Sequence, residues 1–182
     1  MTEAQTYPDI IIDFDYTFAF PIQTIWEKVA DFGGWGKWYP AFGDMALIGD
    51  GIDKIGCIRK FTSKFSGTVY EEDEVEKDAV NYVLKYGTVS EVPHSPFIQN
   101  QLVTVTLQTG GESETKLHAK VVITPYVEVS EEMLGKFKTF GLAGYQAMYD
   151  SLDNYLKAQQ QSPQQNEEET QAQESIVSHW VI

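Results

Sequence analysis

The sequence predicts an α+β fold, in which a seven-stranded antiparallel sheet carries one long C-terminal helix. Three observations predict it. A segment with aromatic residues in period two opens the chain, six further segments of strand character follow with only short turns between them, and a long amphipathic segment comes last. Short links between successive strands are typical of an antiparallel meander. The apolar face of the long helix must be buried, and one concave face of the sheet is the surface that can cover it.

The first elements are a strand and two short helices. A strand is expected at 10–20 because its aromatic residues recur at every second position. Pro21 then opens a short helix over 21–32, since proline suits the first helical position. Gly33 and Gly34 end this helix, and WGKWYP (35–40) has room for one more helical turn before its proline.

Six strands and the long helix follow. The strands are expected at 44–50, 55–64, 67–76, 80–89, 99–109 and 115–127. Turns such as GDG, KFSG and TGGE separate them. Residues 131–157 have apolar side chains at three- and four-residue spacing, with Ser130 as N-cap, which predicts one helix of about six to seven turns.

The composition is that of one globular domain, with 42% hydrophobic and 13% aromatic residues. No stretch approaches the roughly 20 apolar residues that a bilayer span needs. The first residues also lack the basic and apolar regions of a signal peptide. We therefore expect a cytoplasmic protein that does not span a membrane and is a monomer or a weak dimer.

Charge and cysteine content exclude several classes of site. The chain is acidic, with a formal net charge of −14, and Arg59 is its single arginine. Nucleic acids and anionic membranes are unsuitable partners, because both require clustered Lys and Arg. The lone Cys57 cannot form an internal disulfide or a multi-cysteine metal site, and the three histidines have no metal-ligand spacing. No metal and no cofactor are expected.

The composition changes at Ala158. The segment 158–175 is rich in Gln and Glu and cannot bury enough apolar surface to offset its ordering entropy. We expect a domain at 1–157 and a disordered tail at 158–182. The last residues, 176–182, are apolar again. They are either a frayed end or a short peptide that docks on its own domain or on a partner protein.

Strand parity nominates the residues that face the interior, because lysines mark the solvent face of several strands. The inward positions predicted in this way are Arg59, Phe61, Ser63, Tyr82, Leu84, Tyr86, Leu117, Ala119, Val121 and Ile123. Gln101, Val103, Val105 and Leu107 share one face of a further strand.

The acidic run EEDEVE (71–76) is mostly a solvated strand face. Within it, Glu72 can reach Arg59 across the neighbouring strand, and a buried arginine requires such a carboxylate. Two interpretations stay open. The pair either braces the sheet or forms a polar anchor that orients a carbonyl, hydroxyl or carboxylate of an otherwise apolar ligand.

Four segments together resemble a known family. PIQTIWEKVADFGGWGKWYP (21–40), IGCIRKF (55–61), the acidic strand with Glu72 and QNQLVTVTL (99–107) are similar to the polyketide cyclase and lipid transport proteins of the SRPBCC superfamily. These proteins share the helix-grip fold of START domains, the birch-pollen allergen and the abscisic acid receptors. The resemblance covers about residues 10–157. It implies a curved sheet wrapped around the C-terminal helix, two short helices that close one end, and an internal hydrophobic cavity.

The resemblance also bears on the site. It implies that Glu72 faces inward and that the face with Gln101 and Val103 lines the cavity. Asp44 stands where the abscisic acid receptors have a lysine for the ligand carboxylate, and Gln101 stands where they have a cavity tyrosine, which argues against hormone sensing of that kind. The full set of expected ligand-binding residues is Asp44, Arg59, Phe61, Glu72, Tyr82, Leu84, Tyr86, Gln101, Val103, Leu117, Ala119, Phe137, Gly141 and Tyr145.

Three functions are compatible with the predicted fold and cavity. The first is binding or carrying a small hydrophobic molecule, such as a lipid, isoprenoid, polyketide or aromatic metabolite. The second is a metal-free cyclase or dehydratase, a lyase or isomerase, with Glu72, Tyr82, Tyr86 and Arg59 as candidate catalytic groups. The third is an interaction module that uses the acidic tail. The sequence favours binding, because no nucleophile has a neighbouring base and no histidine is expected in the cavity.

Overall fold

The computed structural model describes residues 7–48 and 54–178, with backbone alone for 162–178. It confirms the predicted order of one strand, two short helices, six strands and a long helix. The elements are β1 (Ile10–Phe18), α1 (Ile22–Val29), η1 (Trp35–Lys37), β2 (Ala46–Ile48), β3 (Ile58–Thr62), β4 (Val69–Asp78), β5 (Val83–Val92), β6 (Ile98–Gly111), β7 (Glu114–Pro125) and α2 (Glu131–Ser178).

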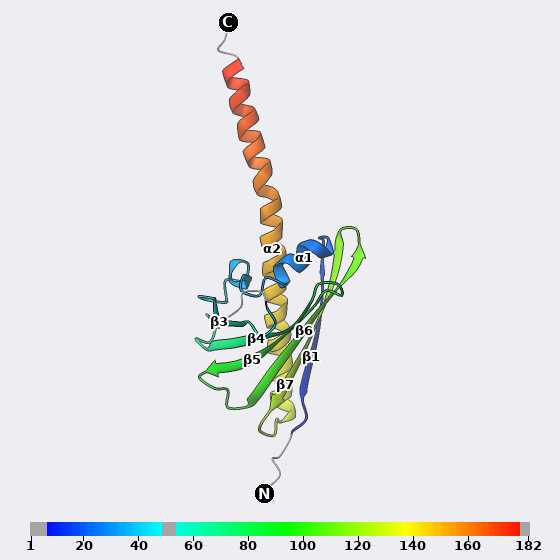
Figure 1. Cartoon of the computed structure of the whole chain (residues 1–182), viewed down its shortest axis with the longest axis vertical. Coiled ribbons are helices and arrows are strands. Elements are labelled where there is room, and N and C mark those ends of the chain that lie inside the picture. The colour runs from blue at the N-terminus through cyan, green and yellow to red at the C-terminus, as the bar shows by residue number, and fades with distance from the viewer. Residues whose placement is uncertain (1–6, 49–53, 179–182) are drawn as a thin grey trace.

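The strands form one antiparallel sheet of seven, in the order β1-β7-β6-β5-β4-β3-β2. Each strand from β2 to β7 pairs with its sequence neighbour, as short turns require. β1 instead pairs with β7, because α1 and η1 carry the chain from one edge of the sheet to the other (Figure 1). The predicted α+β class and the antiparallel meander are both confirmed.

The two short helices and the connector after them close one end of the sheet. We call this region the closed end; it comprises residues 22–42 and the part of α2 that they contact. α1 buries Ile25, Trp26 and Val29 against the sheet. The Nε1 group of Trp35 donates a hydrogen bond to the carbonyl oxygen of Val29 at 3.0 Å, and the Trp35 and Trp38 ring centroids lie 5.3 Å apart. The tryptophan-rich connector is therefore part of the core.

Glycine has a packing role in this connector. A Cβ atom on Gly33 would lie 2.8 Å from Cγ of Leu47, which is closer than side chains normally approach. The absent side chain lets the chain pass directly over β2.

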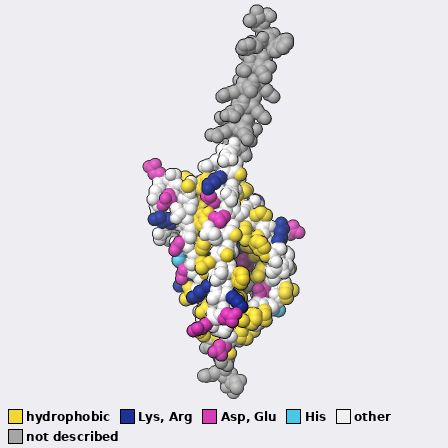
Figure 2. Space-filling model, turned by 180° about the vertical axis from the view of Figure 1, so that it is seen from behind, with side chains coloured by type: hydrophobic (Ala, Val, Ile, Leu, Met, Phe, Trp, Pro, Cys, Tyr) yellow, Lys and Arg dark blue, Asp and Glu magenta, His cyan; other side chains and the backbone are white. Residues whose placement is uncertain are grey.

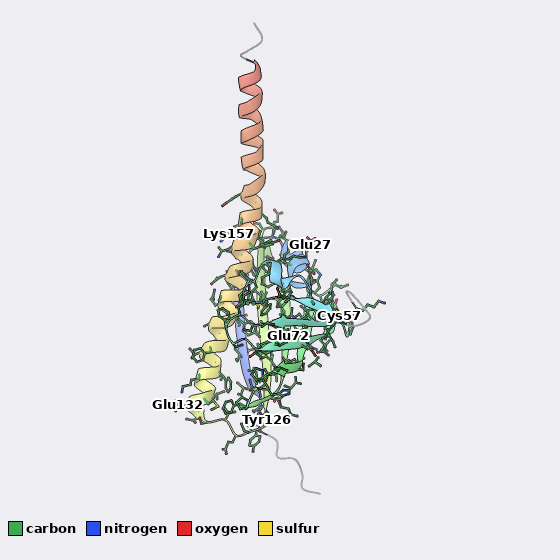
Figure 3. All side chains as sticks on the ribbon, turned by 90° about the vertical axis from the view of Figure 1, so that its left-hand side faces the viewer. Glu27, Cys57, Glu72, Tyr126, Glu132 and Lys157 are labelled. Atoms are coloured by element: carbon green, nitrogen blue, oxygen red, sulfur yellow. The ribbon has the colours of Figure 1, made fainter. Side chains whose placement is uncertain are left out.

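Helix α2 begins at a capped turn and runs beside the sheet. The backbone N–H of Met133 donates to Oγ of Ser130 at 3.3 Å, as expected of an N-cap. Figure 3 shows the part from Glu132 to Lys157 alongside the sheet and the remainder beyond it. None of the helices in the described part of the chain is long and apolar enough to cross a bilayer.

The predicted tail begins within this helix. The backbone stays helical through Ser178, so the structure continues α2 where the sequence predicts a disordered segment. The division into a domain at 1–157 and a disordered tail at 158–182 stays a prediction. Of the predicted docking peptide 176–182, residues 179–182 lie outside the described residues.

Candidate ligand-binding cavity

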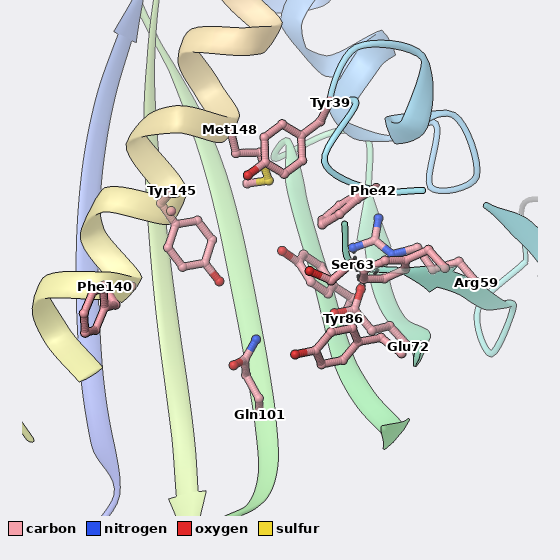
Figure 4. Close-up of a pocket in the computed structure, with 14 residues that line it drawn as sticks. Tyr39, Phe42, Arg59, Ser63, Glu72, Tyr86, Gln101, Phe140, Tyr145 and Met148 are labelled. Carbon is pink, nitrogen blue, oxygen red and sulfur yellow. Dashed lines mark hydrogen bonds and ion pairs between the residues drawn. The ribbon is translucent and has the colours of Figure 1, made fainter. Parts of the chain in front are cut away.

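A cavity of about 280 Å³ lies between α2 and the concave face of the sheet. Helix α2 packs mainly on β1, so space remains between it and the strands β3 to β6. The residues that line the cavity come from the connector, from these four strands, from the β3–β4 turn and from α2 (Figure 4). They are Tyr39, Phe42, Arg59, Phe61, Ser63, Tyr70, Glu72, Tyr86, Gln101, Phe140, Gly141, Gly144, Tyr145 and Met148.

Strand alternation places the charged pair in this cavity. In β3, Arg59 and Phe61 are buried while Lys60 between them is exposed. The β3–β4 ladder sets Arg59 directly opposite Glu72 and Lys60 opposite Glu71. Directly opposite residues on one face lie within side-chain reach, so the register itself produces the pair.

Arg59 is fully buried, and its guanidinium contacts Glu72, a backbone carbonyl and several aromatic rings. Its Nε donates to Oε2 of Glu72 at 2.7 Å, Nη2 lies 2.6 Å from the same oxygen, and Nη1 donates to the carbonyl oxygen of Phe32 at 3.3 Å. The guanidinium carbon lies 4.1 to 5.8 Å from five ring centroids, a distance range in which cation–π attraction operates. These rings belong to Phe32, Trp35, Phe42, Phe61 and Tyr86. Arg59 thus connects the closed end with the cavity wall.

Tyrosine hydroxyls supply the other polar groups of the cavity. Tyr39, Tyr86 and Tyr145 point into it (Figure 4). Burial raises the pKa of Tyr86, and the negative charge of Glu72 raises that pKa further. Burial also raises the pKa of Tyr39 and of Tyr145. All three stay protonated near neutral pH, so each hydroxyl can both donate and accept a hydrogen bond.

The cavity brings together half of the residues expected to bind a ligand. These are Arg59, Phe61, Glu72, Tyr86, Gln101, Gly141 and Tyr145. Ser63, which strand alternation also predicts to face inward, lines the cavity as well.

The other half lies elsewhere. Leu84, Val103, Leu117 and Ala119 face the concave side, as parity predicts, but they are packed into the core away from the cavity. Parity identifies the face of a sheet, whereas the helix and the closed end decide which part of that face stays uncovered. Phe137 is half-buried and packs against the same core.

Asp44 and Tyr82 are corrections of a different kind. Asp44 is exposed in the connector before β2 and does not line the cavity. Tyr82 precedes β5, in a turn where its backbone has a φ of 54°, so strand alternation does not apply to it. Its ring packs edge-on against Trp26 with centroids 5.6 Å apart, which places Tyr82 beneath α1.

Several lining residues were missed. Tyr70 lies two positions from Glu72 in β4 and therefore shares its face. Met148 follows Gly141 by seven residues in α2 and lies on the same face of the helix. The strand and helix periods in the sequence therefore indicate both as lining residues. Tyr39 and Phe42 lie in an irregular connector that has no period to interpret. No cluster of three or more His, Cys, Asp or Glu within residues 7–48 and 54–178 could hold a metal ion.

Comparisons with solved structures show the same fold. The chain is similar to a START superfamily protein from Mycobacterium smegmatis, with 12% identity, 81% of this chain and 97% of that chain covered, and a TM-score of 0.66. It is similar to Ara h 8.0201, with 12% identity, coverage of 83% and 99%, and a TM-score of 0.67. A third similar structure is norcoclaurine synthase from Thalictrum flavum in complex with dopamine and hydroxybenzaldehyde, with 15% identity, coverage of 83% and 88%, and a TM-score of 0.66.

Protein-family models and curated proteins give no match to the sequence. The structural likeness therefore establishes the fold and not the activity. The predicted helix-grip fold, with its curved sheet and long C-terminal helix, is confirmed.

Proposed function

We propose that this helix-grip protein binds and carries a small hydrophobic molecule in the cavity between α2 and the sheet. The observation that carries the proposal is the cavity itself, in which half of the lining residues are aromatic and a few polar groups converge from four strands. A related geometry supports it, because norcoclaurine synthase, a protein of the same fold, is described with two small aromatic compounds.

The size of the cavity narrows the class of ligand. A volume of about 280 Å³ corresponds to on the order of ten to fifteen non-hydrogen atoms, given ~30 Å³ per liquid water and the denser packing of bonded atoms. An aromatic metabolite or a short isoprenoid meets this limit, whereas a long-chain lipid exceeds it. Within the classes that the sequence left open, we favour the aromatic metabolite because seven of the fourteen lining residues carry aromatic rings.

The cavity opens beside α2. Phe140 is 74% exposed at its rim, and a Cβ atom on Gly144 would have no neighbouring atom within 4 Å. Figure 2 shows this face hollowed, with hydrophobic side chains gathered around the hollow. A ligand can therefore enter from this side without unfolding of the sheet.

Native mass spectrometry of gently purified protein, followed by titration with a two-ring compound such as 2-naphthol, tests the proposal. Gly144→Phe places a ring in the mouth of the cavity and should weaken uptake at least tenfold. Gly135→Phe is the matched control, because Gly135 is also an open glycine of α2 but does not line the cavity. A protein that retains and takes up no apolar compound does not have this function.

A metal-free lyase or isomerase is the second candidate function. The favouring observation is that the carboxylate of Glu72 and the hydroxyl of Tyr86 line the same cavity, where they can exchange a proton with a bound substrate. For any compound that the protein transforms, Glu72→Gln should abolish turnover and Tyr82→Phe should leave it unchanged. Unchanged turnover in Glu72→Gln excludes this role.

A further inference from the structure

The two oxygens of the Glu72 carboxylate are not equivalent. Arg59 contacts Oε2 alone, through Nε at 2.7 Å and Nη2 at 2.6 Å. Among the described residues, none donates a hydrogen bond to Oε1, and this oxygen is not among the fully enclosed ones. The Glu72 side chain keeps 7% of its surface exposed, on the cavity side. Oε1 of Glu72 is therefore a charged acceptor in the cavity that receives no hydrogen bond from the described residues.

Arg59 lines the cavity but presents little of its charge to a ligand. The guanidinium is 0% exposed, and aromatic rings and the Phe32 carbonyl surround it. A ligand carboxylate would meet the oxygen of Glu72 before it met a cation, and like charges repel strongly in a desolvated site. A ligand ammonium would have to give up its hydration beside a carboxylate whose charge Arg59 already neutralises, and the loss of that hydration is costly. A neutral donor avoids both costs.

The hydroxyls around Glu72 match such a donor. Tyr86 and Tyr145 line the same cavity and stay protonated near neutral pH, because burial raises the pKa of each. A ligand hydroxyl that donates to Glu72 can accept a hydrogen bond from one of these tyrosines. A carbonyl group can accept from tyrosine, but a ligand that carries only a carbonyl shields Oε1 of Glu72 from water without giving it a donor, and an unsatisfied charged acceptor is costly.

We propose that the cavity selects small ring compounds that carry a hydroxyl group, which donates its proton to Oε1 of Glu72, and that it rejects the corresponding carboxylates. The inference rests on the proposed binding function and specifies its ligand class. It resolves the alternatives of carbonyl, hydroxyl and carboxylate in favour of the hydroxyl.

Three probes with one carbon skeleton test the inference on the full chain at neutral pH: 2-naphthol, 2-methoxynaphthalene and 2-naphthoate, each titrated by calorimetry. We expect 2-naphthol to bind about tenfold tighter than its methyl ether, since a hydrogen bond to a charged group stabilises by about 1.5 kcal/mol or more. We expect 2-naphthoate to bind most weakly. Equal binding of naphthol and ether, or tightest binding of naphthoate, overturns the inference and leaves the proposed function standing. If none of the three binds, the inference fails, and the native mass spectrum decides separately whether the protein retains any apolar compound.

Variants locate the selectivity. Glu72→Gln removes the charged acceptor and leaves Arg59 without its anion, so the preference for naphthol should fall and naphthoate should gain affinity. Glu74→Gln makes the same chemical change at a buried carboxylate of β4 that does not line the cavity, and should leave all three affinities unchanged. An unchanged preference in Glu72→Gln overturns the inference. If Glu72→Gln does not fold, Tyr86→Phe is the second variant, because it keeps the ion pair. It should weaken the binding of 2-naphthol severalfold and leave the binding of the ether unchanged. Equal effects on the two compounds overturn the inference.

Discussion

The two halves of α2 beside the sheet show how one helix serves both stability and binding. From Met148 to Leu156, its inward residues are buried to within a few per cent by β1 and the closed end. Before Met148, the helix lies over the cavity, and Phe140 and Leu142 are 74% and 40% exposed. The later half, from Met148 onward, has core on its inner side, and the earlier half has the cavity. Substitutions in the closed end should therefore reduce stability, while substitutions at the cavity rim should change binding.

Trp35→Ala gives the largest expected effect on this contrast. The indole is fully buried, packs against Trp38 and Tyr86, and donates to the Val29 carbonyl. Its removal should lower the free energy of unfolding by about 4 kcal/mol, from lost packing and an unsatisfied carbonyl. Urea denaturation measures the change.

Phe140→Ala is the matched aromatic deletion at the rim. It should change the unfolding free energy by no more than about 0.5 kcal/mol and weaken 2-naphthol binding. A similar loss of stability in both variants contradicts the division of α2 into two roles.

Arg59→Met should have the next largest effect and lower the free energy of unfolding by about 3 kcal/mol, because it leaves the carboxylate of Glu72 buried without its cation. The neighbouring pair is a close control: Lys60 and Glu71 contact at 2.9 Å one position along the same strands, but the Lys60 side chain is 49% exposed. Lys60→Met should cost less than about 1 kcal/mol. The double variant Arg59→Met with Glu72→Leu should recover part of the loss, and a loss equal to the single variant's contradicts the argument.

The fold was predictable from the sequence because its signals are local and periodic. The alternation in 10–20, the proline and glycines around the first helix, and the three- and four-residue spacing after Ser130 each specify an element without reference to its neighbours. The Arg59–Glu72 pair was predictable for another reason. The chain has a single arginine, parity turns it inward, and the adjacent strand offers carboxylates.

The cavity itself was only half predictable. Leu117 and Ala119 obey the same alternation as Phe61, but the packing of α2 on β1 covers the part of the sheet where they lie. Such packing depends on contacts between distant segments, which no window of sequence contains. Tyr39 and Phe42 come from an irregular connector, where no period relates position to direction.

The buried tyrosines predict how stability depends on pH. Burial raises the pKa of Tyr86, Tyr145 and Tyr149 above the ordinary value near 10, which holds in the unfolded chain. Above that pH the unfolded state loses these protons first, so unfolding becomes more favourable. Stability from these groups should be constant below about pH 10 and fall as the pH rises further. Urea midpoints across this range, with phenolate absorbance, measure it. Tyr145→Phe should reduce the fall, and a flat profile contradicts the shifts.

The smallest expected effects separate the two roles of α2 most cleanly. Gly135 and Gly144 both lie inside the helix, and a Cβ atom on either would have no neighbour within 4 Å. Alanine at each position should stabilise the protein by about 0.5 to 1 kcal/mol, because it restricts the unfolded chain and favours the helix. Only Gly144 lines the cavity, so only Gly144→Ala should also change the affinity for 2-naphthol, by a few fold. Equal gains in stability with a change in affinity at Gly144 alone mean that these two positions are free of the core and that Gly144 serves the ligand. A change in affinity at Gly135 of the same size would mean that the helix transmits the effect, and that the open half is less independent than its exposure indicates.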